Sequence, residues 1–71
     1  MKVFYDDEVD ALYIQFEELK PDGVTEISEG INLDTTSENK VVGIEILDAF
    51  QKLNLDTILS YSLSIEKKVS V

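Results

Sequence analysis

A chain of 71 residues has room for a single domain, 1–71, and with neither cysteine nor histidine it lacks disulfides and the usual zinc ligands. Fifteen acids against six bases, all of them lysine, give a net charge of −9. This charge disfavours contact with nucleic acid and with anionic membranes, because both are bound through basic side chains. A core this small usually needs further stabilisation, which we expect from self-association.

The start of the chain gives no sign of export. Met1 and Lys2 are followed within a few residues by acids, without the apolar core of a signal peptide. No stretch approaches the roughly 20 apolar residues that a membrane-spanning helix needs. The absence of cysteine also fits a reducing compartment. We therefore expect a cytoplasmic protein.

The first two thirds of the sequence alternate between apolar and polar residues, which is typical of strands. Residues 2–5 and 11–16 form the first two predicted strands, on either side of an acidic turn. Residues 24–35 keep one phase of alternation that Gly30 interrupts, which indicates a bulge or a division into two strands. A further strand is expected over 40–47. Together these segments predict an antiparallel β-meander.

The pattern becomes helical after the last of these strands. Asp48 is placed to cap a short helix over 49–53, and 54–59 resembles a second helical turn. Residues 60–66 alternate as a strand would, yet they directly continue a helical segment, so both readings stay open. The predicted fold class is α+β: a small antiparallel β-meander, a short C-terminal helical segment and, on one reading, a last strand.

Apolar residues fall on both faces of the predicted sheet. The face expected to meet the helix carries Val3, Tyr5, Leu12, Ile14, Phe16, Ile27, Ile31, Leu33, Val42, Ile44 and Ile46. The opposite face carries Phe4, Tyr13 and Val41. One short helix covers one face only, so a second copy of the chain is the simplest cover for the other; isolated exposed apolar residues are the alternative. We expect a homo-oligomer with these three residues as interface candidates.

Four carboxylates crowd the turn between the first two predicted strands. The spacing of Asp6, Glu8 and Asp10 matches the first ligand positions of a calcium loop, but Ala11 stands where that loop requires glycine. Asp6 and Asp10 are better suited to turn-forming and capping roles. The alternative is a divalent-metal site that forms only if distant acids converge in the fold. Its candidate ligands are Asp6, Asp10, Asp34 and Asp48.

Residue types that commonly carry catalysis are scarce. Without histidine or cysteine the ordinary bases of a catalytic triad are missing, and the three glycines form no phosphate-binding motif. The sequence therefore indicates no catalytic residue and no cofactor, and it favours a protein that is not an enzyme.

Three blocks of sequence occur in order and resemble one family. They are M-K-V-x-Y-D-x-x-x-D-A-L-Y-I at the start, G-I-x-L-D at 30–34 and V-V-G-I-E-I-L-D-A at 41–49. Together they resemble domain-of-unknown-function family 2283, which consists of small prokaryotic proteins. The resemblance runs from Met1 to about Leu53, with Asp7 standing where the family is expected to have proline. It implies a bacterial or archaeal origin, the cytoplasm, a compact β-rich fold and no established activity or catalytic residue.

Three functional hypotheses follow from these observations. The first is a non-enzymatic binding or assembly module that works as a homo-oligomer. The second is an acidic, antitoxin-like partner of a basic protein, in line with the association of the resembled family with small toxin-like proteins. The third is a carboxylate site for a divalent metal, with unknown activity.

Overall fold

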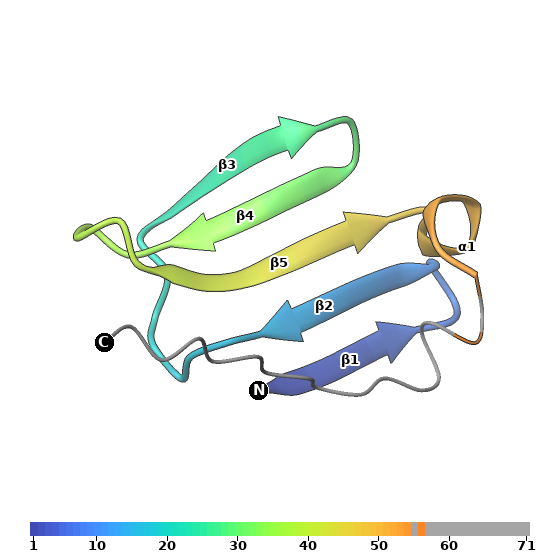
Figure 1. Cartoon of the computed structure of the whole chain (residues 1–71), viewed down its shortest axis with the longest axis horizontal. Helices are drawn as coiled ribbons and strands as arrows, with labels where there is room; N and C mark the ends of the chain where they lie inside the picture. Colours follow the sequence, from blue (N-terminus) through green and yellow to red (C-terminus); the bar gives the residue numbers. More distant parts are fainter. Residues whose placement is uncertain (55, 57–71) are drawn as a thin grey trace, which may run out of the picture.

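Five antiparallel strands form one sheet, and a short helix lies at one end of it (Figure 1). This computed structural model describes residues 1–54 and 56. The elements are β1 (Lys2–Asp6), β2 (Ala11–Gln15), β3 (Gly23–Ser28), β4 (Ile31–Thr35), β5 (Val41–Leu47) and α1 (Ala49–Lys52). The predicted α+β class, with an antiparallel meander before a short helix, is confirmed. The predicted last strand at 60–66 lies outside the described residues.

The order of strands in the sheet is β1-β2-β5-β4-β3. β1 and β2 form a hairpin, β3, β4 and β5 follow one another as neighbours, and β5 joins the two groups by pairing with β2. The chain therefore crosses from β2 to the far edge of the sheet. There the backbone N–H of Asp22 donates to the carbonyl oxygen of Thr35 at 2.9 Å, just before β3 begins. β1 and β3 are the two edge strands of the sheet that the described residues form.

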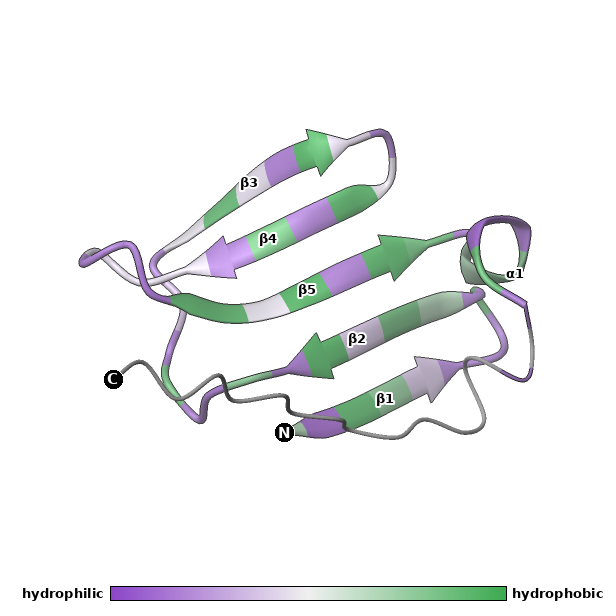
Figure 2. Ribbon diagram, viewed as in Figure 1, coloured by the Kyte–Doolittle hydropathy of each residue, from purple (hydrophilic) through white to green (hydrophobic). Residues whose placement is uncertain are grey.

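Gly30 divides the long alternating stretch into β3 and β4, as one reading of the sequence predicted. Its φ of 73° lies in the left-handed region, which glycine adopts without steric cost. The register shifts between Glu26 and Ser28, so Ile27 is the extra residue of a β-bulge. Figure 2 shows hydrophobic and hydrophilic bands that alternate along β4 and β5, which is the period expected when the two sides of a sheet differ.

α1 lies at one end of the sheet and packs against one of its sides through Ala49 (Figure 1). Leu12 and Ala49 form the buried cluster there, with exposed fractions of 3% and 0%. The partly buried residues packed around this cluster are Val3, Tyr5, Ile14, Ile46 and Leu53. Among the described residues the other buried hydrophobic side chain is Val42. The core is therefore small, as the chain length predicts. No helix in the described part of the chain is both long and apolar enough to cross a membrane.

Polar side chains bond to one another on the opposite side of the sheet. Tyr13 reaches across Gly43 of β5 and donates its phenolic hydrogen to Oδ2 of Asp34 at 2.9 Å. Nδ2 of Asn32 donates to Oε1 of Glu45 at 3.1 Å. The missing side chain at Gly43 makes room for the Tyr13 ring: a Cβ built there would lie 2.5 Å from Cζ of Tyr13 and 2.8 Å from the carbonyl oxygen of Ile14.

Replacing Gly43 with alanine should therefore destabilise the fold. The Tyr13 ring can move aside, but the Ile14 carbonyl belongs to the neighbouring strand and cannot, so we expect a loss of about 1–3 kcal/mol in the free energy of unfolding. Gly23→Ala is the matched control, because a Cβ at Gly23 meets nothing within 4 Å. Chemical denaturation measures both. Equal stability of the two variants would contradict this account of Gly43.

Candidate functional site

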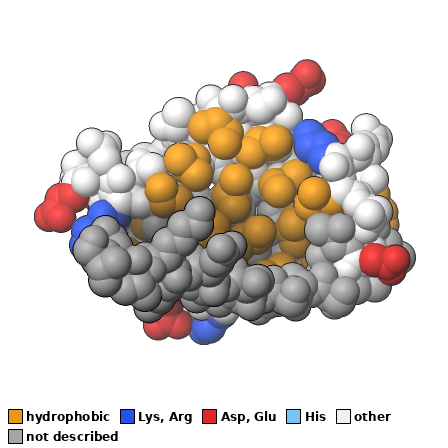
Figure 3. Space-filling view, in the orientation of Figure 1, with side chains coloured by type: hydrophobic (Ala, Val, Ile, Leu, Met, Phe, Trp, Pro, Cys, Tyr) orange, Lys and Arg blue, Asp and Glu red, His pale blue; other side chains and the backbone are white. Residues whose placement is uncertain are grey.

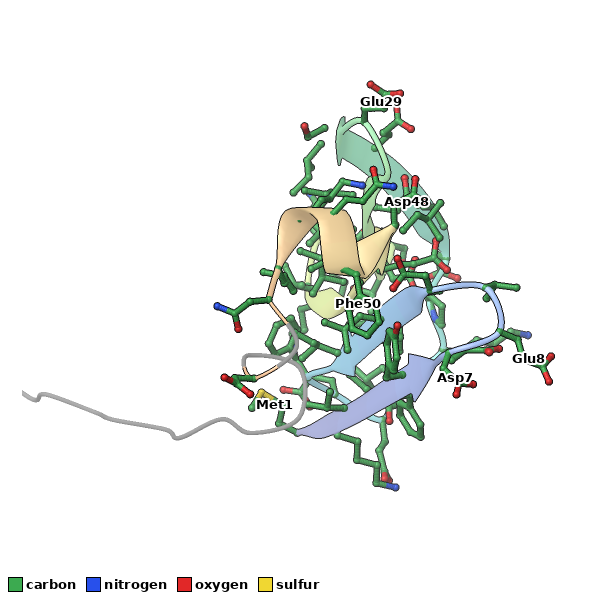
Figure 4. All side chains as sticks on the ribbon, turned by 90° about the vertical axis from the view of Figure 1, so that its right-hand side faces the viewer. Met1, Asp7, Glu8, Glu29, Asp48 and Phe50 are labelled. Carbon is green, nitrogen blue, oxygen red and sulfur yellow. The ribbon has the colours of Figure 1, made fainter. Side chains whose placement is uncertain are left out.

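The acidic turn between β1 and β2 is organised by its own backbone. Oδ1 of Asp6 accepts a hydrogen bond from the backbone N–H of Glu8 at 3.0 Å, which is the contact that lets aspartate initiate a turn. Asp7 and Glu8 point away from the sheet (Figure 4). The turn-forming role predicted for Asp6 is confirmed.

Asp10 joins the turn to β1 and to α1. Its Oδ1 accepts the hydroxyl hydrogen of Tyr5 at 2.7 Å, and both carboxylate oxygens lie 3.2 Å from the backbone nitrogen of Phe50. Its carbonyl oxygen accepts the backbone N–H of Ala49 at 3.1 Å. Two N–H groups at the start of α1 are thus satisfied by a residue about forty positions earlier in the chain. The sequence assigned the cap of this helix to Asp48, so the bonds of Asp10 to α1 were not predicted.

The expectation that Asp48 caps α1 is wrong. Asp48 occupies the N-cap position, but its backbone is left-handed, with φ 51° and ψ 49°, and its side chain makes no capping hydrogen bond. A capping side chain normally projects from an extended backbone, from which it reaches the N–H groups of the first turn. From the left-handed conformation the Asp48 side chain makes no such bond, and the carboxylate of Asp10 accepts the N–H of Phe50 instead.

Tyr5 and Phe50 make the apolar part of the same junction. Their ring centroids lie 5.4 Å apart and the rings are tilted by 39°, a favourable arrangement for an aromatic pair. Burial, with smaller effects from the hydrogen bond to Asp10 and from its charge, raises the pKa of Tyr5 to about 12. Burial and the bond to Asp34 likewise raise the pKa of Tyr13.

The four aspartates proposed as metal ligands have separate surroundings. Asp6 and Asp10 bond within the turn junction, Asp34 accepts from Tyr13 on the opposite side of the sheet, and Asp48 precedes α1. Among the residues that the structure describes, no three acidic side chains lie close enough together to hold a metal ion. The metal hypothesis therefore gains no support from this geometry.

The three interface candidates differ in how much of each side chain is accessible. Phe4 and Val41 are 52% and 40% exposed. Tyr13 is partly buried, and its hydroxyl is used by Asp34. Phe4 and Val41 remain accessible for contact, and their role as interface residues stays a prediction.

A hollow between the β3–β4 turn and α1 was not predicted from the sequence. It is lined by Glu26, Glu29, Gly30, Leu47, Asp48, Gln51 and Lys52. Nζ of Lys52 donates to the carbonyl oxygen of Leu47, and this bond ties the end of α1 to the end of β5. Residues that are distant in the sequence and meet only in the fold cannot be recognised from local sequence spacing. The excess of acids in the lining makes the hollow electronegative.

These features describe a small single-sheet α+β protein in which distinctive tyrosines and aspartates bond to one another. The chain belongs to a family of proteins of unknown function, DUF2283, whose family model matches residues 2–49. The resemblance inferred from the sequence is thereby confirmed. The matched segment includes all five strands and ends at the first residue of α1. Comparisons with curated proteins and with solved structures give no significant match.

Asp10→Gly should show how much the carboxylate of Asp10 contributes to stability, apart from the backbone conformation of this residue. Glycine tolerates the φ of 53° found there, so the variant loses the bonds to Tyr5 and Phe50 without adding strain. We expect the free energy of unfolding to fall by about 1–2 kcal/mol. Asp48→Gly is the matched control, since Asp48 has φ 51° and no capping bond, and its stability should be unchanged or raised by up to about 1 kcal/mol. Similar losses in both would contradict the role assigned to Asp10.

Stability should fall as the pH rises from 10 to about 12. Free tyrosine has a pKa of 10.0, and the folded protein raises that of Tyr5 to about 12, so in this window the folded state keeps a proton that the unfolded state loses. Below pH 10 this contribution is fully present. Denaturant unfolding across the window measures the slope, and Tyr5→Phe should make it shallower. An unchanged slope in that variant would contradict the assignment.

Proposed function

We propose that this chain is a non-enzymatic binding and assembly module that works as a homo-oligomer, with the side of the sheet that carries α1 as its contact surface. The observation that supports this proposal is that the described residues cover that side only in part. Ile31, Leu33 and Ile44 share it with the buried cluster, but they lie beyond the residues that pack against the cluster. Ile27, in the bulge of β3, is 56% exposed.

The space-filling view supports the same reading. Figure 3 shows hydrophobic side chains gathered over the centre of this side, with acidic and lysine side chains around its border. Ile31, Leu33 and Ile44 are partly buried, and Ile27 is exposed beside them. Apolar surface that is rimmed by polar groups typically marks a protein–protein contact. Covering it removes apolar area from water, which stabilises the assembly by roughly 25 cal/mol per Å² of area buried. A chain whose described residues include three buried hydrophobic side chains gains stability from such cover.

A second copy of the chain is the occupant that this surface suits best. It offers an apolar surface of the same extent, and a two-fold arrangement places each patch against itself. The acids at the border stay in water on either side of such a contact, where salt screens their repulsion.

A basic protein partner is the second candidate. The charge of −9 and the hollow lined by Glu26, Glu29 and Asp48 favour it, since acidic surfaces attract basic partners over long distances. The two candidates make different demands on the purified chain. A chain that is monomeric alone and forms a salt-sensitive complex with a basic protein supports the second candidate over the first.

The oligomeric state of the purified full chain tests the first candidate. We expect sedimentation velocity at micromolar concentration to show a species larger than a monomer. Ile27→Glu should weaken this self-association by about tenfold or more, because it puts a charge into the apolar contact. Val24→Glu is the matched control: Val24 lies in the same strand, is 66% exposed, and pairs with Asp34 on the other side of the sheet. A monomeric wild type, or equal effects of the two variants, would contradict the proposal.

A further inference from the structure

Among the described strands, β1 leaves one edge unpaired, and its sequence is complementary to itself when the strand is reversed. β1 is an edge strand with the sequence KVFYD, so an antiparallel copy reads DYFVK beside it (Figure 1). We propose that β1 pairs with β1 of a second copy about a two-fold axis at Phe4, which joins two five-stranded sheets into one. This contact deepens the proposed self-association, on which it rests, by naming a second surface distinct from the apolar side.

The charges of β1 favour the antiparallel arrangement. In this register Lys2 of each copy lies directly opposite Asp6 of the other, which gives two pairs of opposite charge. Side chains directly opposite one another on neighbouring strands have Cβ atoms about 4.5–5.5 Å apart, close enough for such pairs to stabilise the sheet. In a chain with a charge of −9, these pairs also offset part of the repulsion between copies.

The middle of β1 supplies the apolar part of the contact. Phe4 meets Phe4 of the second copy on the side of the sheet away from α1, where its side chain is 52% exposed. Val3 and Tyr5 of the two copies oppose one another on the other side. Facing aromatic residues stabilise neighbouring strands beyond the area that they bury.

The two charged ends of β1 are free to take new partners. Nζ of Lys2 lies 3.1 Å from Oε1 of Glu18, but both side chains are more than 60% exposed, and ion pairs of this kind contribute little to stability. One carboxylate oxygen of Asp6 accepts the N–H of Glu8. A carboxylate has further acceptor sites, so Asp6 can hold Lys2 of the second copy without giving up the turn.

The other edge of the sheet is less suited to this contact. β3 has the sequence GVTEIS, in which Glu26 has no base to oppose it in an antiparallel copy. The bulge at Ile27 also disturbs the regular edge, as bulges commonly do in strands that must not pair. The pattern therefore assigns the pairing to β1 and leaves β3 unpaired at its outer side.

A single introduced cysteine tests the proposed register. The chain has no cysteine of its own, so Phe4→Cys creates a unique thiol at the two-fold axis. Directly opposed residues of antiparallel strands lie about 4.5–5.5 Å apart at Cα, within the range of a disulfide. Under mild oxidation this variant should form a covalent dimer at least about tenfold faster than Val24→Cys, because pairing raises the effective concentration of the thiol. Val24, on the other edge strand, is 66% exposed and is thus the more accessible control.

Charge reversal then tests the ion pairs in the Phe4→Cys background. Lys2→Glu and Asp6→Lys should each slow the cross-linking by about fivefold, because each creates like-charge pairs. Combining both substitutions restores opposite charges and should restore the rate. Circular dichroism verifies that each variant is folded. Cross-linking of Phe4→Cys no faster than that of Val24→Cys, or a combined variant as slow as the single ones, would overturn the proposal.

These results are independent of the test of the apolar side. If Ile27→Glu lowers the mass of the assembly while Phe4→Cys fails to cross-link, the β1 contact is overturned and the apolar contact stands. If Phe4→Cys cross-links while Ile27→Glu keeps the wild-type mass, the β1 contact stands and the apolar contact is overturned.

Discussion

The carboxylate of Asp10 is the interaction on which the arrangement of the other parts depends. A helix of four residues has no stability of its own, since isolated helices shorter than about 12 residues are marginal in water. α1 exists because Asp10 satisfies its first N–H groups and because Ala49 packs on Leu12. The same carboxylate orients Tyr5 at the end of β1. Asp10 thus decides where on the sheet α1 packs.

The two sides of the sheet differ in the groups that they expose. On the side away from α1, Tyr13 bonds to Asp34 and Asn32 bonds to Glu45, so the polar atoms are paired where they lie. That side needs no cover to satisfy them. On the other side Leu33 and Ile44 extend the apolar surface beyond the helix. The sequence predicted a partner on the side without the helix, at Phe4, Tyr13 and Val41, and this stays a prediction. Leu33 and Ile44 are the reason for proposing a contact on the side with the helix.

The strands were predictable because one side of the sheet is apolar, so side chains must alternate with a period of two. The stretch predicted at 11–16 became β2 (Ala11–Gln15), and Gly30 separates β3 from β4 as one reading expected. Alternation says which side a residue faces but not which strand lies beside it, so the position of β5 next to β2 could not be derived. The contact of Asp10 with Phe50 spans forty residues and follows from that order. Local spacing suggested the nearer Asp48 instead.

The distribution of charge bears on how the proposed association would avoid aggregation. Unpaired strand edges invite further strands, and a large net charge of one sign opposes such contacts in general. A particular contact then needs local charges that override the general repulsion. In β1 the lysine and the aspartate stand at opposite ends, so antiparallel pairing opposes unlike charges. Parallel, in-register stacking would place lysine on lysine and aspartate on aspartate, which is unfavourable. The same five residues therefore favour a closed pair of sheets over an open stack.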